Sequence, residues 1–103
     1  YAEELRTQSQ ALAATTAALW ASGDPQVALA NASLYLEAAG HVVVAWLWLS
    51  QLVTASDKSG DFYDGKRAAG RYFFHYELPK ASTQFAVLNS LDRTALDAQP
   101  EWF

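Results

Sequence analysis

The chain has 103 residues, of which 51% are hydrophobic and 17% charged, with no Cys and no Met. This length supports one compact domain over residues 1–103, and the composition excludes intrinsic disorder, a collagen-like repeat and a disulfide-stapled scaffold. The formal net charge of −4 disfavours nucleic acid as a partner, because phosphate binding needs a positive surface. We therefore expect a single globular domain.

The first residue is Tyr1 and no Met occurs, which we interpret as a processed chain or an excised piece of a longer one. The opening residues are acidic and polar, whereas a secretion signal needs a basic patch followed by an apolar run. The absence of Cys is compatible with a reducing compartment. Together these features predict a cytoplasmic location.

The first predicted helix covers residues 2–21, which are rich in Ala, the strongest helix former. Its apolar stripe consists of Leu5, Leu12 and Leu19. Gly23 can take the left-handed conformation that ends a helix, Asp24 can cap the next one, and Pro25 suits a first helical position. The sequence therefore predicts a tight turn between two helices.

The second predicted helix runs from Pro25 to about Ala55 and would be about 45 Å long. Residues 38–49 are apolar on every face, so this helix is either buried on all sides or lies in a bilayer. Polar side chains interrupt both ends of the apolar stretch, which is then too short to span a membrane. These side chains are Glu37, His41, Ser50 and Gln51. We expect burial in protein and no membrane contact.

The third predicted helix runs from residue 62 to 78, with Asp61 as its cap. Its expected apolar stripe consists of Phe62, Ala69, Tyr72, Phe73 and Tyr76. Pro79 lacks an N–H and clashes with the preceding turn, so it kinks or ends this helix before a further amphipathic segment. The tail from residue 92 onward is expected to be partly irregular, with Trp102 and Phe103 as anchors.

These elements predict an all-α fold, an antiparallel up-down-up bundle of three long helices with the third kinked or broken at Pro79. Three helices cannot cover a middle helix that is apolar all round. Some of its aromatic surface should therefore contact another domain or subunit. The expected core or interface anchors are Trp46, Trp48, Tyr72, Phe73 and Phe74.

Catalytic and metal-binding motifs are missing from the sequence. The only histidines are His41 and His75, without the spacing of a zinc or di-iron site, and no nucleophile elbow or phosphate-binding glycine loop occurs. We therefore predict no catalytic, cofactor-binding or metal-ligating residue in this chain.

Some polar residues are candidates for a ligand site or a structural network. Glu37 and His41 lie one helical turn apart and can share a proton or a hydrogen bond. Arg67, Arg71 and His75 form a basic row flanked by aromatic rings, which favours a salt-bridged surface but can also hold an anion. Glu77 is expected to cap its helix or to bridge to Lys80 or to an arginine of a neighbouring helix.

Several stretches carry a resemblance to a known family. They are VALANASLYLE (27–37), GHVVVAWLW (40–48), FYDGK (62–66), RYFF (71–74) and ELP (77–79). These segments resemble the C-terminal extension of a subgroup of bacterial acyl-CoA dehydrogenases that includes methylmercaptopropionyl-CoA dehydrogenase-like enzymes. The similarity covers nearly the whole chain.

The resemblance implies a parent oxidoreductase of fatty acid metabolism that oxidises an acyl-CoA thioester with FAD. Its catalytic and FAD-binding residues belong to upstream domains, and none of them maps onto a position here. The extension is then a helical appendage that packs on the catalytic core or a homodimer interface. The alternative is a free-standing helical module that binds an apolar or anionic small ligand through His41, Arg67 and Arg71.

Overall fold

The computed structural model describes residues 1–103, and all of its regular elements are helices, without a β-strand. Its elements are α1 (Ala2–Ala21), α2 (Pro25–Leu29), α3 (Ala32–Ala55), α4 (Asp61–Tyr72), the π-helix η1 (Phe73–Glu77), α5 (Lys80–Asn89), α6 (Thr94–Asp97) and the 3₁₀-helix η2 (Pro100–Trp102). The predicted all-α class is confirmed.

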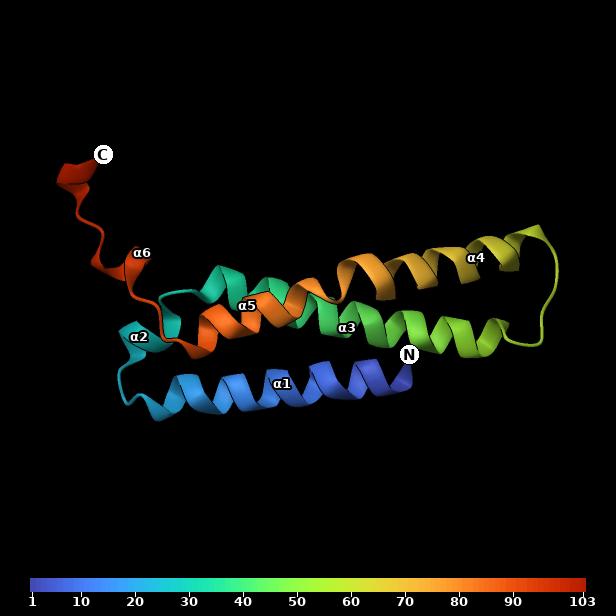
Figure 1. Ribbon diagram of the computed structural model, residues 1–103, viewed down its shortest axis with the longest axis horizontal. Coiled ribbons are helices and arrows are strands. Elements are labelled where there is room, and N and C mark those ends of the chain that lie inside the picture. Colours follow the sequence, from blue (N-terminus) through green and yellow to red (C-terminus); the bar gives the residue numbers. More distant parts are fainter.

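The turn between α1 and α2 has the predicted chemistry. Gly23 has a φ of +73°, the left-handed region in which a glycine is favoured. The Asp24 side chain accepts a hydrogen bond at 2.9 Å from the backbone N–H of Gln26, and Pro25 occupies the first helical position. These residues reverse the chain in a few positions, so α1 and α3 lie side by side (Figure 1).

The prediction of one continuous helix from Pro25 to Ala55 is wrong. The helix breaks at Ala30 and Asn31, and α3 begins at Ala32. The Asn31 amide donates a hydrogen bond at 3.0 Å to the carbonyl of Asp92, which anchors the segment after α5. Asn competes with the helix through such bonds, and here a contact distant in sequence decides the break.

The chain also leaves the regular α-helix ahead of Pro79. In η1 the Leu78 N–H donates to the Phe73 carbonyl at 2.9 Å, a bond five residues back along the chain. The proline ring would meet the carbonyl four residues before it in a regular helix, and the wider π turn makes room for that ring. Helical geometry resumes in α5 at Lys80.

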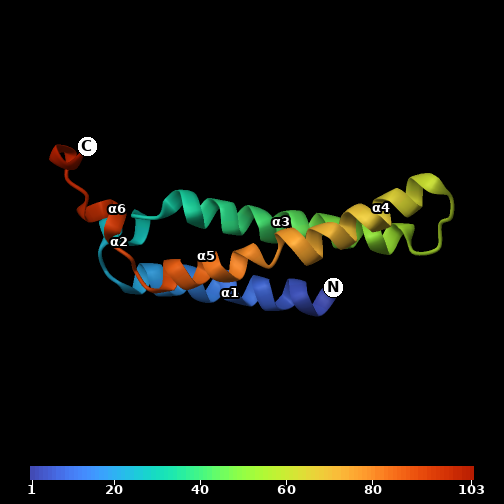
Figure 2. The same ribbon diagram turned by 45° about the horizontal axis from the view of Figure 1, so that its top comes forward.

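The helices form an elongated body. α1, α3 and α5 contact one another pairwise, whereas α4 packs on the C-terminal half of α3, beyond the N-terminus of α1 (Figures 1 and 2). The body measures 58 × 31 × 15 Å, with a radius of gyration of 17.2 Å. A compact domain of this length would have about 13 Å. α3 is the one long helix that contacts each of the other three, α1, α4 and α5.

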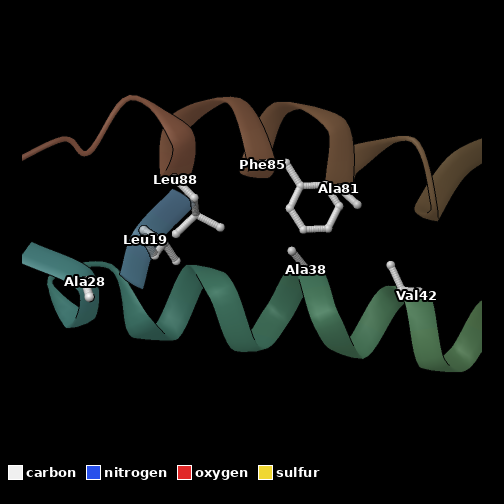
Figure 3. Close-up of a cluster of buried hydrophobic side chains, with 7 residues drawn as sticks. All are labelled: Leu19, Ala28, Ala38, Val42, Ala81, Phe85 and Leu88. Atoms are coloured by element: carbon white, nitrogen blue, oxygen red, sulfur yellow. The ribbon is translucent and has the colours of Figure 1, made fainter. Parts of the chain in front are cut away.

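Two apolar clusters hold the helices together. The larger cluster, between α1, α2, α3 and α5, consists of Leu19, Ala28, Ala38, Val42, Ala81, Phe85 and Leu88 (Figure 3). The smaller one consists of Ala45, Phe74 and Leu78. Ala38 and Ala81 are fully buried, and such small side chains let α3 and α5 approach closely.

The chain leaves much surface uncovered for its size. Its accessible area is 6704 Å², against about 5,700 Å² for a compact monomer of this mass. The excess of about 1,000 Å² has two visible sources: the α3–α4 pair that extends past α1, and the C-terminal segment that leaves the body (Figure 1). Trp102 and Phe103 are 69% and 97% exposed, so their prediction as anchors is not met within this chain.

The prediction of which face of the third helix is buried is wrong. Phe62, Tyr72 and Tyr76 are exposed, and α4 instead turns Gly70 towards Leu52 of α3. A Cβ built on Gly70 would lie 2.8 Å from the Leu52 Cδ2 atom. Close helix contact through a glycine therefore decides which face of α4 is covered, and the larger rings remain outside.

This contact predicts opposite effects at two glycines of α4. Gly70→Ala gains about 1 kcal/mol of helix propensity but costs about 1 to 3 kcal/mol by overpacking against Leu52, so we expect a net loss of stability. Gly65→Ala meets no atom within 4 Å and should stabilise the chain by about 0.5 to 1 kcal/mol. Urea unfolding of both variants measures the difference, and equal effects would contradict this packing.

Candidate interaction surface on α3

One side of α3 is apolar and uncovered. We call the set Leu36, Val43, Val44, Trp46, Leu47 and Val53 the open face of α3. The exposed fractions of these side chains range from 38% for Val44 to 73% for Leu36. Their spacing places them on one side of the helix, opposite Ala38, Val42 and Ala45, which face α1, α5 and η1.

The open face carries no formal charge beyond Glu37, whose exposed carboxylate adjoins Leu36. Residues 38–55 include no Asp, Glu, Lys or Arg, and Gly40 lies among the exposed side chains with open space where a Cβ would stand. Exposed apolar patches of this kind mark sites of contact with proteins, ligands or membranes. The sequence-based expectation that this helix is too apolar to be covered by its own chain thus agrees with the exposures.

By length and composition, α3 is also able to cross a membrane, with 24 residues and a mean hydropathy of 1.4 over its most apolar window. Such a helix is weak evidence for a span, since core helices pass the same test. The covered side of α3 packs on α1, α4 and α5, and α1 and α4 expose charged side chains such as Glu4 and Asp61. A span would require these neighbours to enter the bilayer with it.

A hollow of about 310 Å³ lies between the end of α3 and the start of α4. It is lined by Ser50, Gln51, Thr54, Ala55, Phe62, Tyr63 and Lys66. The Lys66 ammonium lies 5.5 Å from the Phe62 ring centroid and 5.9 Å from that of Trp48. These cation–π contacts fix Lys66 across the α3–α4 seam.

His41 and Glu77 form a polar link between α3 and η1. The His41 Nε2 atom lies 3.3 Å from Glu77 Oε2, and its Nδ1 atom lies 2.9 Å from the backbone carbonyl of Glu37. The expected link to Glu37 is thus made to its main chain and not to its carboxylate. Lys80 donates to both Glu77 carboxylate oxygens, as its position in the sequence suggested. His41 also stacks on Phe73, with ring centroids 5.8 Å apart.

The ammonium of Lys80, followed by the imidazole of His41, lowers the pKa of Glu77 below its usual value. A depressed folded-state pKa stabilises the fold at neutral pH, and this contribution disappears as the pH falls through the lowered pKa. We expect the melting temperature of the unmodified chain to exceed that of Glu77→Gln at pH 7. The gap should close at pH values below the ordinary carboxyl pKa of about 4.3. A constant gap would exclude this link as the cause.

The basic residues have separate environments. Arg67 donates to the Ala55 and Lys58 carbonyls at 2.7 and 3.0 Å and pairs with Asp64, so it fastens the loop between α3 and α4. Arg71 is exposed and forms no ion pair. His41 and Arg67 thus each have a carboxylate partner within the chain, whereas Arg71 has none.

Comparison with known families agrees with the sequence resemblance. Residues 1–99 match the family described as Acetyl-CoA dehydrogenase C-terminal like. The chain belongs to this family. No curated protein and no solved structure gives a significant match. As a member of the C-terminal-like family, the chain corresponds to the C-terminal part of acyl-CoA dehydrogenases, which are FAD enzymes.

The lining of the largest hollow in this C-terminal-like domain does not fit FAD. The largest hollow, of about 420 Å³, lies between the start of α1 and the η1–α5 junction. It is lined by Glu3, Glu4, Thr7, Gln8, Phe74, His75, Leu78, Pro79 and Ser82. Two carboxylates at its rim would repel the diphosphate of the cofactor, and no arginine or lysine lines it to compensate.

The predicted aromatic anchors separate into two groups. Phe74 is buried, and Phe73 and Trp48 are partly buried where α3 meets α4 and η1. Trp46 and Tyr72 are 58% and 56% exposed. Tyr72 stacks on Tyr76, with ring centroids 4.5 Å apart, on the outer side of α4 and η1. The sequence indicated that aromatic residues of these segments lie in the core or at an interface. It did not indicate which ring contacts which neighbouring helix.

Proposed function

We propose that this domain is a non-catalytic accessory and assembly element of an FAD-dependent acyl-CoA dehydrogenase-like enzyme. In this proposal the open face of α3 packs on the catalytic core or across the dimer interface of the parent. The parent is a cytoplasmic homodimer of the methylmercaptopropionyl-CoA dehydrogenase-like subgroup, with FAD held by the upstream domains. Within the parent enzyme the domain forms an up-down-up bundle of three long helices, the third of which is interrupted at Pro79.

The open face of α3 is the observation that carries this proposal. Six large apolar side chains are exposed on one side of α3, and residues 38–55 carry no charge. Covering these side chains with another part of the parent enzyme would remove their apolar surface from water, which is the main favourable term in protein association.

The reading frame of the gene and flavin absorbance test the proposal. We expect the open reading frame to encode dehydrogenase domains ahead of Tyr1. The purified 103-residue chain should show no flavin absorbance near about 450 nm after incubation with FAD, whereas the parent should show it. A frame without a dehydrogenase, or flavin bound by the chain alone, would overturn the proposal.

A further inference from the structure

We propose that the hollow between the end of α3 and the start of α4 binds a small aromatic carboxylate. We call it the Lys66 hollow, and its volume of about 310 Å³ lies at the lower end of the range for small-molecule sites. It is found where the α3–α4 pair extends past the N-terminus of α1 (Figure 1). The inference goes beyond the accessory role and does not depend on it.

The charge of the Lys66 hollow selects an anion. The Lys66 ammonium is the only charged group in the lining, and it forms no ion pair within the chain. The nearby carboxylate of Asp64 already pairs with Arg67 at 2.6 Å. The rings of Phe62 and Trp48 hold the Lys66 ammonium instead, and such contacts leave its hydrogen-bond donors free for a ligand oxygen.

The walls of the Lys66 hollow fit an aromatic body. Phe62 and Tyr63 both line it, and their rings lie at 89° to one another with centroids 5.2 Å apart. A third ring can add edge-to-face or offset contact to this pair. Phe62 is 68% exposed, so a ring bound against it would also remove apolar surface from water.

Contacts behind the Lys66 hollow hold its walls in place. Ala55 lines the hollow at the end of α3, and its carbonyl accepts a hydrogen bond from Arg67 at 2.7 Å. Arg67 also donates to the carbonyl of Lys58 at 3.0 Å, and farther along α4 Gly70 packs closely against Leu52. The two helices are thus fixed relative to each other, so a ligand does not have to order them.

Other ligand classes fit this lining less well. A cationic ligand would meet the Lys66 ammonium at close range. A phosphate carries more charge than one lysine neutralises, and the lining includes no arginine for bidentate binding. A single carboxylate matches the one ammonium, and the side chains of Ser50 and Gln51 add neutral donors on the α3 side.

Titration of the isotope-labelled 103-residue chain with phenylacetate, followed by NMR, tests the site. We expect saturable binding with a Kd of about 1 mM and shift changes centred on the backbone amides of Thr54, Phe62 and Lys66. Benzyl alcohol and benzylamine present a similar body without the negative charge. Each should bind about tenfold or more weakly, because the ion pair with Lys66 is missing.

Lys66→Met tests the role of the charge, since methionine keeps an apolar stem and its contact with the rings. Phenylacetate should bind about tenfold more weakly to this variant, whereas the affinity for benzyl alcohol should stay unchanged. Lys66→Arg keeps the cation and should restore binding to within about threefold. Lys58→Met removes the same charge from the loop outside the lining and is the matched control.

Phe62→Ala tests the aromatic wall. This exposed ring can be removed with little loss of stability, and both phenylacetate and benzyl alcohol should then bind more weakly. Trp46→Ala, which removes a ring 58% exposed on the open face, should change neither affinity.

Four results would overturn the proposal. They are no saturable binding of phenylacetate, equal affinity for phenylacetate and benzylamine, equal weakening by Lys58→Met and Lys66→Met, and shift changes centred on Val43 and Leu47 of the open face. Because these measurements use the 103-residue chain alone, none of the results bears on the accessory role in the parent enzyme.

Discussion

Phe74→Ala should produce the largest loss of stability of any single truncation in this chain, about 3 to 5 kcal/mol. Phe74 is 2% exposed, packs with Ala45 and Leu78, and stacks on the Tyr1 ring with centroids 4.6 Å apart. Large side chains such as Leu52, Phe73 and Leu78 surround the ring, so its removal leaves a cavity that they can fill only in part. Since domains of this size are stable by only about 5 to 15 kcal/mol, the variant should lie close to unfolding.

Thermal and urea unfolding measure this effect, at about 4 to 8 °C in melting temperature per kcal/mol. Tyr76→Ala, two residues along in η1 and 63% exposed, is the control and should cost far less. Trp46→Ala should also be mild in the 103-residue chain when it is held monomeric, because its ring lies mainly in solvent. A loss for Trp46→Ala equal to that for Phe74→Ala would contradict the distinction between core and open face.

In the parent dehydrogenase, Leu47→Glu should disrupt assembly. Leu47 is 46% exposed in this chain, so a carboxylate there is solvated and should change the stability of the domain by about 0.5 kcal/mol or less. When the open face is covered, the same carboxylate is buried without a partner at a cost of several kcal/mol. Assembly should then weaken by about a hundredfold or more.

Sedimentation of the flavin-loaded parent measures the assembled fraction, and activity per bound flavin separates assembly from chemistry. We expect the assembled fraction to fall and the activity per bound flavin to stay unchanged. Val87→Glu, on the exposed side of α5, is the matched control and should change neither. If Leu47→Glu leaves the assembled fraction intact, the open face is not an interface. If it instead lowers activity per flavin in an assembled enzyme, the domain influences the active site.

The contrast between Phe74 and Trp46 shows how far residue type alone determines burial. Both are large aromatics in apolar segments, and the sequence named both as anchors. Phe74 lies on the side of η1 that meets α3, whereas Trp46 lies on the side of α3 that no other helix covers. Whether a side chain is buried depends on which helices pack against its side of the helix, and that is determined by the whole chain.

The sequence was sufficient to predict a turn whose backbone groups are all satisfied by residues of the turn itself. The Gly23–Asp24–Pro25 turn needs only a left-handed glycine, a capping carboxylate and a fixed proline φ, so the sequence determined it, together with the helical class and the apolar character of α3. The break at Asn31, the packing of α4 through Gly70 and the His41–Glu77 contact depend on groups far apart in sequence. Tertiary structure alone decided these, because each is set by the distance between two helices and not by the propensity of one.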